Sequence, residues 1–229
     1  MRRKTFLISD LIVIDMAFPI SKLTIAPIYK LWLRKAEGLD NLPKGAFIIA
    51  GNHTSYYDTL LIPCIIIPKI KRKMHAWVNS SYWKNPFTGF FLTIWECIPI
   101  YVKNEKNTRR KNNEAFEKAL CYLKKNEPIM IFPEGHRSKD GKLQKAYTGI
   151  SRLALKAKVP VVPAGIIGSN KVLPKGKTFP RFARCDVKIG NPIYFEKYCN
   201  KKPTKKDFEE ATRIIMKEIA KLINQEYNY

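Results

Sequence analysis

The sequence predicts a single α/β domain with a central, mostly parallel or mixed sheet flanked by helices. From Gly45 onward, short runs rich in β-branched residues alternate with longer stretches of helical periodicity, as in strand–helix–strand units. The chain has 229 residues, of which 45% are hydrophobic, so it is long enough to bury one sizeable core. No internal repeat, low-complexity block or Gly/Ser linker marks a second globular domain.

Five short apolar runs are expected to form the strands of this sheet. They span Ala46–Ala50, Ile98–Val102, Pro128–Phe132, Val159–Ile166 and Cys185–Ile189. Two stretches, 112–125 and 149–158, repeat apolar residues at helical spacing and should cover a face of the sheet. Thr204 and Asp207 have the pattern of a capping box and predict a C-terminal helix over residues 204–226.

An apolar and basic segment, residues 1–34, precedes the expected domain of residues 35–229. Its mixture of apolar side chains and cations is typical of an interfacial membrane anchor. Asp10 and Asp15 interrupt it, so we expect neither a cleavable signal peptide nor a membrane-spanning helix. A helix packed on the domain's own core explains the pattern equally well.

The composition narrows the classes of partner and of site. Lys and Arg outnumber Asp and Glu by 42 to 19, which gives a formal net charge of +23, so the surface should attract nucleic acid or anionic lipid. The five cysteines have no C-x-x-C spacing, and the three histidines form no Cys/His cluster. We therefore expect a reducing compartment, no metal site and no cofactor.

A polar loop, GNHTSYYD, follows the first expected strand and runs from Gly51 to Asp58. In one regular helix His53 and Asp58 would point roughly 140° apart. They can meet only if a turn or a helix start lies between them, so this motif predicts a local bend. Asp58 would then orient the imidazole, whose other nitrogen takes a proton from a substrate hydroxyl. The alternative is a surface histidine, with Asp58 capping a helix.

A second polar loop, PEGHRS, follows the expected strand at Pro128–Phe132 and runs from Pro133 to Ser138. Proline and glycine favour a tight turn here, and Arg137 offers a planar fork suited to phosphate. We expect Glu134 either to hold a polyol hydroxyl or to orient Arg137. Taken alone, this loop is better explained as an ion-paired turn, and it gains weight beside the first motif.

Together the two loops resemble the motifs of glycerolipid acyltransferases of the lysophosphatidic acid acyltransferase type. The matching residues are Asn52, His53 and Asp58 in the N-H-x-x-x-x-D block, and Phe132, Pro133, Glu134, Gly135, Arg137 and Ser138 in the F-P-E-G-x-R-S block. Weaker similarities extend the resemblance over about residues 35–195. It implies an α/β core and a His53 general base held by Asp58. It also implies an acceptor pocket that includes Glu134, Gly135 and Arg137.

The sequence departs from the family pattern at two places. Where members commonly carry an arginine that helps bind the acceptor phosphate, this chain has Val102, followed by Lys103. Lys84, Lys103 and Lys145 are the candidates to compensate, although a lysine does not reproduce an arginine fork. Tyr147 and Thr148 stand where many members have lysines. The identity of the acceptor is therefore less firmly implied than the type of reaction.

The resemblance implies transfer of a fatty acyl group from acyl-CoA or an acyl-carrier protein to a lysophospholipid hydroxyl. The expected acceptor is 1-acylglycerol-3-phosphate and the expected product is phosphatidic acid. The chain has no G-x-S-x-G elbow and no cysteine beside either motif, so we expect direct transfer without an acyl-enzyme. The expected partner is an anionic membrane surface rather than nucleic acid, with the protein peripheral or monotopic on its cytoplasmic face.

Four other functions stay open. An acyltransferase for a different lysolipid acceptor would share every motif, and a hydrolase would use His53 and Asp58 to activate water. An inactive lipid-binding relative is compatible with Val102. A nucleic-acid-binding module would explain the charge, but there is no recognition-helix, zinc-finger or RNP pattern.

Overall fold

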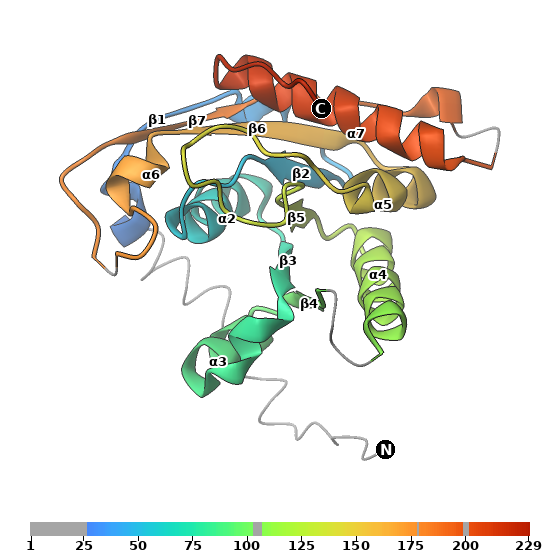
Figure 1. Cartoon of the computed structure of the whole chain (residues 1–229), viewed down its shortest axis with the longest axis horizontal. Helices are drawn as coiled ribbons and strands as arrows, with labels where there is room; N and C mark the ends of the chain where they lie inside the picture. Colours follow the sequence, from blue (N-terminus) through green and yellow to red (C-terminus); the bar gives the residue numbers. More distant parts are fainter. Residues whose placement is uncertain (1–26, 103–106, 178, 199–201) are drawn as a thin grey trace.

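Seven strands form one mixed sheet in the order β1-β7-β6-β2-β5-β3-β4 (Figure 1). The computed structural model describes residues 27–102, 107–177, 179–198 and 202–229. The strands are β1 (Leu33–Glu37), β2 (Ile48–Gly51), β3 (His75–Asn79), β4 (Ile98–Ile100), β5 (Ile129–Ile131), β6 (Val161–Ile167) and β7 (Cys185–Ile189). Neighbouring strands are parallel except β6 and β7, which are antiparallel. The expected α/β fold with a mixed sheet is confirmed.

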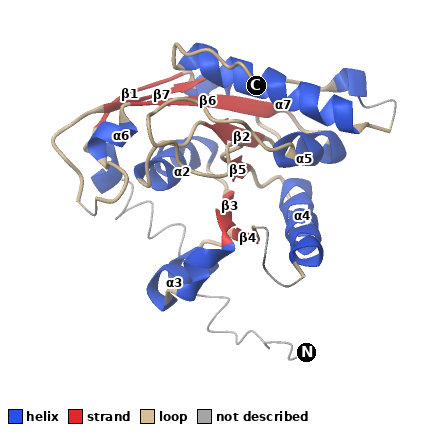
Figure 2. Ribbon diagram, viewed as in Figure 1, coloured by secondary structure: helices blue, strands red, loops and turns tan. Residues whose placement is uncertain are grey.

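Helices cover both faces of this sheet (Figure 2). They are α2 (Tyr57–Ile70), α3 (Pro86–Ile94), α4 (Thr108–Lys124), α5 (Gly149–Ala157), α6 (Ser169–Val172) and α7 (Lys205–Leu222), with short 3-10 turns η1 (Leu39–Asn41), η2 (Ser80–Lys84) and η3 (Glu196–Tyr198). Successive residues of a strand face opposite sides. Ile48 and Ala50 of β2 therefore pack with α4, α5 and α7, whereas Ile49 packs with α2.

The five predicted strands are present, with ends within two residues of the expected ones, whereas α4 begins four residues before the expected 112. The capping box of Thr204 and Asp207 is present, and α7 starts at Lys205, directly after the N-cap Thr204, but ends at Leu222. The strand expected at Ile98–Val102 ends at Ile100. Strands β1 and β3, and helices α2, α3 and α6, were not predicted.

The segment expected to precede the domain lies mostly outside the described residues. Its last part is described, and β1 begins there at Leu33, where it pairs with β7. The boundary between residues 34 and 35 stays a prediction, as does the membrane contact of the segment. In the described ranges, no helix combines the length and the apolar character needed to span a bilayer.

The topology brings three chain segments to one edge of the sheet. β2 lies between β5 and β6 and is parallel to both, so the carboxyl ends of all three strands share an edge. The first polar loop follows β2, and the second follows β5. Open α/β sheets place their functional groups at this kind of edge.

Candidate active site

The two polar loops are joined directly at the carboxyl edge of β2 and β5. The backbone N–H of His53 donates to Oε1 of Glu134 at 2.8 Å, and the backbone N–H of Ser138 donates to the carbonyl oxygen of His53, also at 2.8 Å. The two motifs are far apart in sequence, and yet both backbone groups of His53 are bound by the second loop. The structure therefore unites the two motifs in a single site.

His53 and Asp58 meet because α2 begins between them. The Nδ1 atom of His53 lies 3.0 Å from Oδ2 of Asp58, which also accepts hydrogen bonds of 2.8 Å from the backbone N–H groups of Thr54 and Ser55. Asp58 is fully buried in the first turn of α2, which starts at Tyr57. The predicted bend is confirmed. A carboxylate can only accept, so Nδ1 carries the proton and Nε2 is the basic nitrogen.

Packing fixes the plane of the His53 ring. The ring stacks on Phe132 of the second motif, with centroids 4.1 Å apart and planes inclined by 13°. A Cβ atom at Gly51 would lie 3.2 Å from the Phe132 ring, which is tight for any side chain larger than hydrogen. The His53 side chain is 12% exposed, so a substrate hydroxyl can reach it while most of the ring is shielded.

Glu134 links the two loops from a fully buried position. Its Oε1 accepts from the His53 N–H, and its Oε2 accepts from the backbone N–H of Gln144 at 2.8 Å. Burial raises the pKa of Glu134 to about 7, although the two backbone N–H bonds oppose this shift. The contacts observed are with the backbone of His53 and Gln144, and the expected contact of this carboxylate with substrate or Arg137 stays a prediction.

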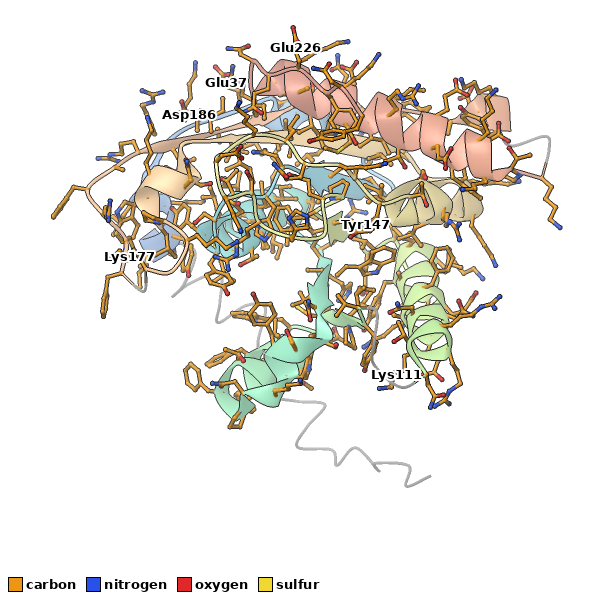
Figure 3. All side chains as sticks on the ribbon, in the orientation of Figure 1. Glu37, Lys111, Tyr147, Lys177, Asp186 and Glu226 are labelled. Atoms are coloured by element: carbon orange, nitrogen blue, oxygen red, sulfur yellow. The ribbon has the colours of Figure 1, made fainter. Side chains whose placement is uncertain are left out.

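A left-handed turn follows Glu134. Gly135 has a φ of +70°, which favours glycine, and its N–H donates to the carbonyl oxygen of Phe132 at 3.0 Å. A Cβ atom there would lie 2.9 Å from the ring of Tyr147, which precedes α5 (Figure 3). Tyr147 is one of the two departures from the family pattern, and it packs against the turn that carries the second motif.

The guanidinium of Arg137 packs over the ring of Tyr56, which we call the aromatic shelf. Its Cζ atom is 3.4 Å from the centre of the Tyr56 ring, and the Tyr56 hydroxyl accepts from the hydroxyl of Tyr82 at 3.0 Å. The Nη1 atom of Arg137 is buried and has no hydrogen-bond partner among the described residues. A planar cation with an unused donor is suited to an anionic oxygen. Tyr56 and Tyr82 were not predicted as site residues, and the only signal in the sequence was that Tyr56 lies inside the first motif.

The other motif residues support the loops. The side chain of the buried Asn52 bridges the backbone of Ile166 in β6, donating to its carbonyl oxygen at 2.9 Å and accepting from its N–H at 2.7 Å. Pro133 is buried, and its carbonyl oxygen accepts from the N–H of Tyr147. The hydroxyl of Ser138 donates to Oδ1 of Asp140 at 2.9 Å. These contacts hold both loops against the sheet.

Two expectations about ligands stay untested. Lys103 lies outside the described residues, so its contact with an acceptor phosphate remains a prediction. In the described part of the chain, no three His, Cys, Asp or Glu residues lie together in a way that could hold a metal ion.

Comparison with known proteins places this geometry in context. The family model described as acyltransferase matches residues 34–167. The chloroplastic 1-acyl-sn-glycerol-3-phosphate acyltransferase of Arabidopsis thaliana is 28% identical over 160 residues, covering 68% of this chain and 41% of that protein. The 1-acyl-sn-glycerol-3-phosphate acyltransferase of Saccharomyces cerevisiae is 29% identical over 166 residues, covering 71% and 52%. The chain thus spans about half the length of these curated relatives.

A solved structure shares the fold. The crystal structure of the 1-acyl-sn-glycerophosphate acyltransferase from Thermotoga maritima superposes with a TM-score of 0.64, covering 95% of this chain and 89% of that one at 20% sequence identity.

Proposed function

The chain belongs to the acyltransferase family, and from that premise we propose that it transfers a fatty acyl group from an acyl thioester to the free hydroxyl of a lysophospholipid. The observation that carries the proposal is the His53–Asp58 pair, joined to the loop of Arg137 at one edge of the sheet. The proposed acceptor is 1-acyl-sn-glycerol-3-phosphate, which the names of the relatives support, and the product is phosphatidic acid.

In the proposed mechanism, Nε2 of His53 takes the proton of the acceptor hydroxyl as that oxygen attacks the thioester carbonyl. The tetrahedral intermediate then collapses, the C–S bond breaks, and the thiolate leaves with the proton returned by the imidazolium. Asp58 stabilises this imidazolium through its bond to Nδ1. General-base help of this kind is worth about 10²- to 10⁴-fold, so the positioning of the two substrates must supply much of the rest.

Transfer without an acyl-enzyme fits the cysteines of the described chain. Burial raises the pKa of Cys64 to about 11 and those of Cys97 and Cys185 to about 12, so none of the three is a thiolate near neutral pH. Cys121 is exposed on α4 and belongs to neither motif. His53 therefore acts on the acceptor rather than on a protein nucleophile.

We assign the acceptor phosphate to Arg137, with Lys103 as a second cation. The guanidinium packs against the Tyr56 ring, and this contact limits the entropy lost when its fork binds phosphate. We also propose that Glu134 positions the His53 loop rather than contacting substrate, because both of its oxygens accept backbone hydrogen bonds.

The donor and the location complete the proposal. Acyl-CoA and acyl-carrier protein both present the required thioester, which is a co-substrate and not a cofactor. The formal charge of +23 supports peripheral or monotopic binding to the anionic, cytoplasmic face of a membrane.

The test is acyl transfer from radiolabelled acyl-CoA or acyl-carrier protein to lysophosphatidic acid on anionic vesicles. His53→Ala should abolish product, whereas His136→Ala, at an exposed histidine in the second loop, should not. Arg137→Ala should raise the KM for the acceptor more than it lowers kcat.

Two results contradict the proposal. Thioester consumption by wild type without lipid product indicates a hydrolase. Vesicle binding without product from any lysolipid of a panel indicates a lipid-binding relative.

A further inference from the structure

We propose that the connection from α6 to β7 is a docking loop for an anionic lipid bilayer. The docking loop consists of residues 173–177 and 179–184, and it works together with residues 28–31 at the start of the described chain. Phe182 is fully exposed and Phe179 is 82% exposed, while Ile28 and Leu31 are 56% and 63% exposed. A group of large apolar side chains in solvent usually marks a surface that meets a partner or a membrane.

Hydrogen bonds hold the backbone that carries these exposed side chains. The N–H of Arg181 donates to the carbonyl oxygen of Val172 at 2.7 Å, and the indole N–H of Trp32 donates to the carbonyl oxygen of Arg181 at 3.0 Å. The guanidinium of Arg184 donates to the carbonyl oxygen of Leu31 at 2.7 Å. These bonds join the docking loop to residues 31 and 32, so the two segments that carry the apolar side chains lie side by side, at the same side of the sheet in Figure 1.

Cations surround the apolar side chains. From Ser169 to Cys185 the sequence contains no Asp or Glu, and its exposed cations are Lys171, Lys175, Lys177, Arg181 and Arg184. Figure 3 shows Lys177 on the side of the view away from Lys111 of α4. Exposed phenylalanines among lysines and arginines suit an anionic headgroup layer with acyl chains beneath it. Nucleic acid would use the cations but would give Ile28 and Leu31 no role.

The docking loop is continuous with two other features of the chain. The apolar and basic segment at the N-terminus, an interfacial anchor by its sequence, enters the described chain at residue 27. At the other end, the hydroxyl of Ser55 donates to the carbonyl oxygen of Leu173 at 2.7 Å, and the hydroxyls of Thr54 and Ser169 lie 2.9 Å apart. The root of the docking loop thus touches the loop of His53. If the proposed function holds, docking brings the general base to the surface that holds the acceptor.

The first test is vesicle sedimentation of the full-length chain. Phosphatidylcholine vesicles with and without phosphatidylglycerol are compared. Phe179→Ala/Phe182→Ala should weaken binding to the anionic vesicles by about tenfold or more, and Lys175→Ala/Lys177→Ala should weaken it by several-fold in low salt only. All four side chains are exposed, so circular dichroism and thermal unfolding should not change.

Matched controls come from the opposite edge of the sheet. Tyr194 is 62% exposed and follows Ile193, which pairs with Val161 at the start of β6. Lys124 and Lys125 are exposed at the end of α4. Tyr194→Ala and Lys124→Ala/Lys125→Ala should leave binding unchanged. Equal losses in these controls, or no loss in the docking-loop variants, overturn the proposal.

A fluorescent probe tests immersion directly. An environment-sensitive dye is attached to Phe182→Cys after Cys121 and Cys199 are replaced by serine, with Tyr194→Cys as the control position. Anionic vesicles should shift the emission at position 182 to the blue and leave position 194 unchanged. A blue-shifted emission at position 182 before vesicles are added means that the chain itself or a second copy covers the loop. That result, or a shift with RNA or DNA but not with vesicles, also overturns the proposal.

Acyl-transfer assays on micelles and on vesicles distinguish loss of membrane docking from loss of catalysis. With acceptor dispersed in neutral detergent micelles, the docking-loop variants should retain wild-type acyl transfer, and they should lose it only on vesicles. If neither wild type nor any variant transfers acyl groups, but the docking-loop variants still bind vesicles less than wild type, the proposed function is refuted and membrane docking by this loop is supported.

Discussion

Glu134→Gln removes one acceptor from the buried side chain that joins the two loops. The carboxylate accepts backbone hydrogen bonds of 2.8 Å on both oxygens, from His53 and from Gln144. Glutamine keeps one carbonyl oxygen and turns an NH₂ group toward the other N–H donor. A buried donor without a partner costs about 1–3 kcal/mol. We expect the free energy of unfolding to fall by about this amount near pH 4.5, where the Glu134 carboxyl is protonated in the folded state.

The effect of this substitution should depend on pH in a defined direction. Burial raises the pKa of Glu134 from an ordinary value of 4.5 to about 7, so between these values the folded state binds a proton that the unfolded state releases. The stabilising contribution of Glu134 is therefore complete below pH 4.5, declines as the pH rises, and is lost above about pH 7. By proton linkage, this pKa difference changes the free energy of unfolding by roughly 3 kcal/mol. Glutamine does not titrate, so the difference in stability between wild type and variant should shrink by that amount.

Urea unfolding followed by tryptophan fluorescence, repeated between pH 4.5 and 8, measures this difference. Glu114→Gln is the control, because Glu114 is an exposed residue of α4 paired with Arg110 and surface pairs contribute little. If the stability difference between wild type and Glu134→Gln is constant with pH, or grows as the pH rises, the raised pKa of Glu134 is refuted. A control that shows the same pH trend refutes its assignment to Glu134.

Three further substitutions test the rest of the site. Asp58→Asn should lower kcat by about 10²- to 10⁴-fold in the transfer assay with little change in acceptor KM, because the His53 imidazolium loses its counter-charge. Asn52→Ala removes two hydrogen bonds to the Ile166 backbone and should cost about 2–4 kcal/mol in urea unfolding. Gly135→Ala forces a side chain onto a φ of +70° and should cost about 1–3 kcal/mol in the same measurement.

The meeting of His53 and Asp58 follows from the sequence by simple geometry. The spacing of His53 and Asp58 requires a bend, and α2 supplies it by starting at Tyr57. The contacts of Glu134 did not follow, because its partners are backbone N–H groups, which every residue except proline carries. The sequence shows which side chains a loop contains. Only the folded structure shows which of them already form hydrogen bonds with the backbone. The shelf of Tyr56 under Arg137 was missed for the same reason.

The elements that the sequence did not predict have identifiable causes. β1 reads LRKAE, and its exposed residues Arg34 and Lys35 resemble a basic surface cluster rather than an edge strand. α2 contains Pro63 and Pro68 within a long apolar run, and proline normally argues against a helix interior. Burial of Leu61 and its neighbours against the sheet outweighs that local penalty. Local propensity failed where tertiary packing decides the structure.

The supports of the site divide into two groups that should affect different kinetic constants. His53 is held through its N–H by Glu134, through its ring nitrogen by Asp58 and through its ring face by Phe132. These contacts leave Nε2 as the ring nitrogen available for proton transfer, so damage to them should appear in kcat. Arg137 rests on Tyr56 instead and has a donor to spare, so damage there should appear in the KM for the acceptor. The expected kinetic division follows from the different side chains that contact His53 and Arg137.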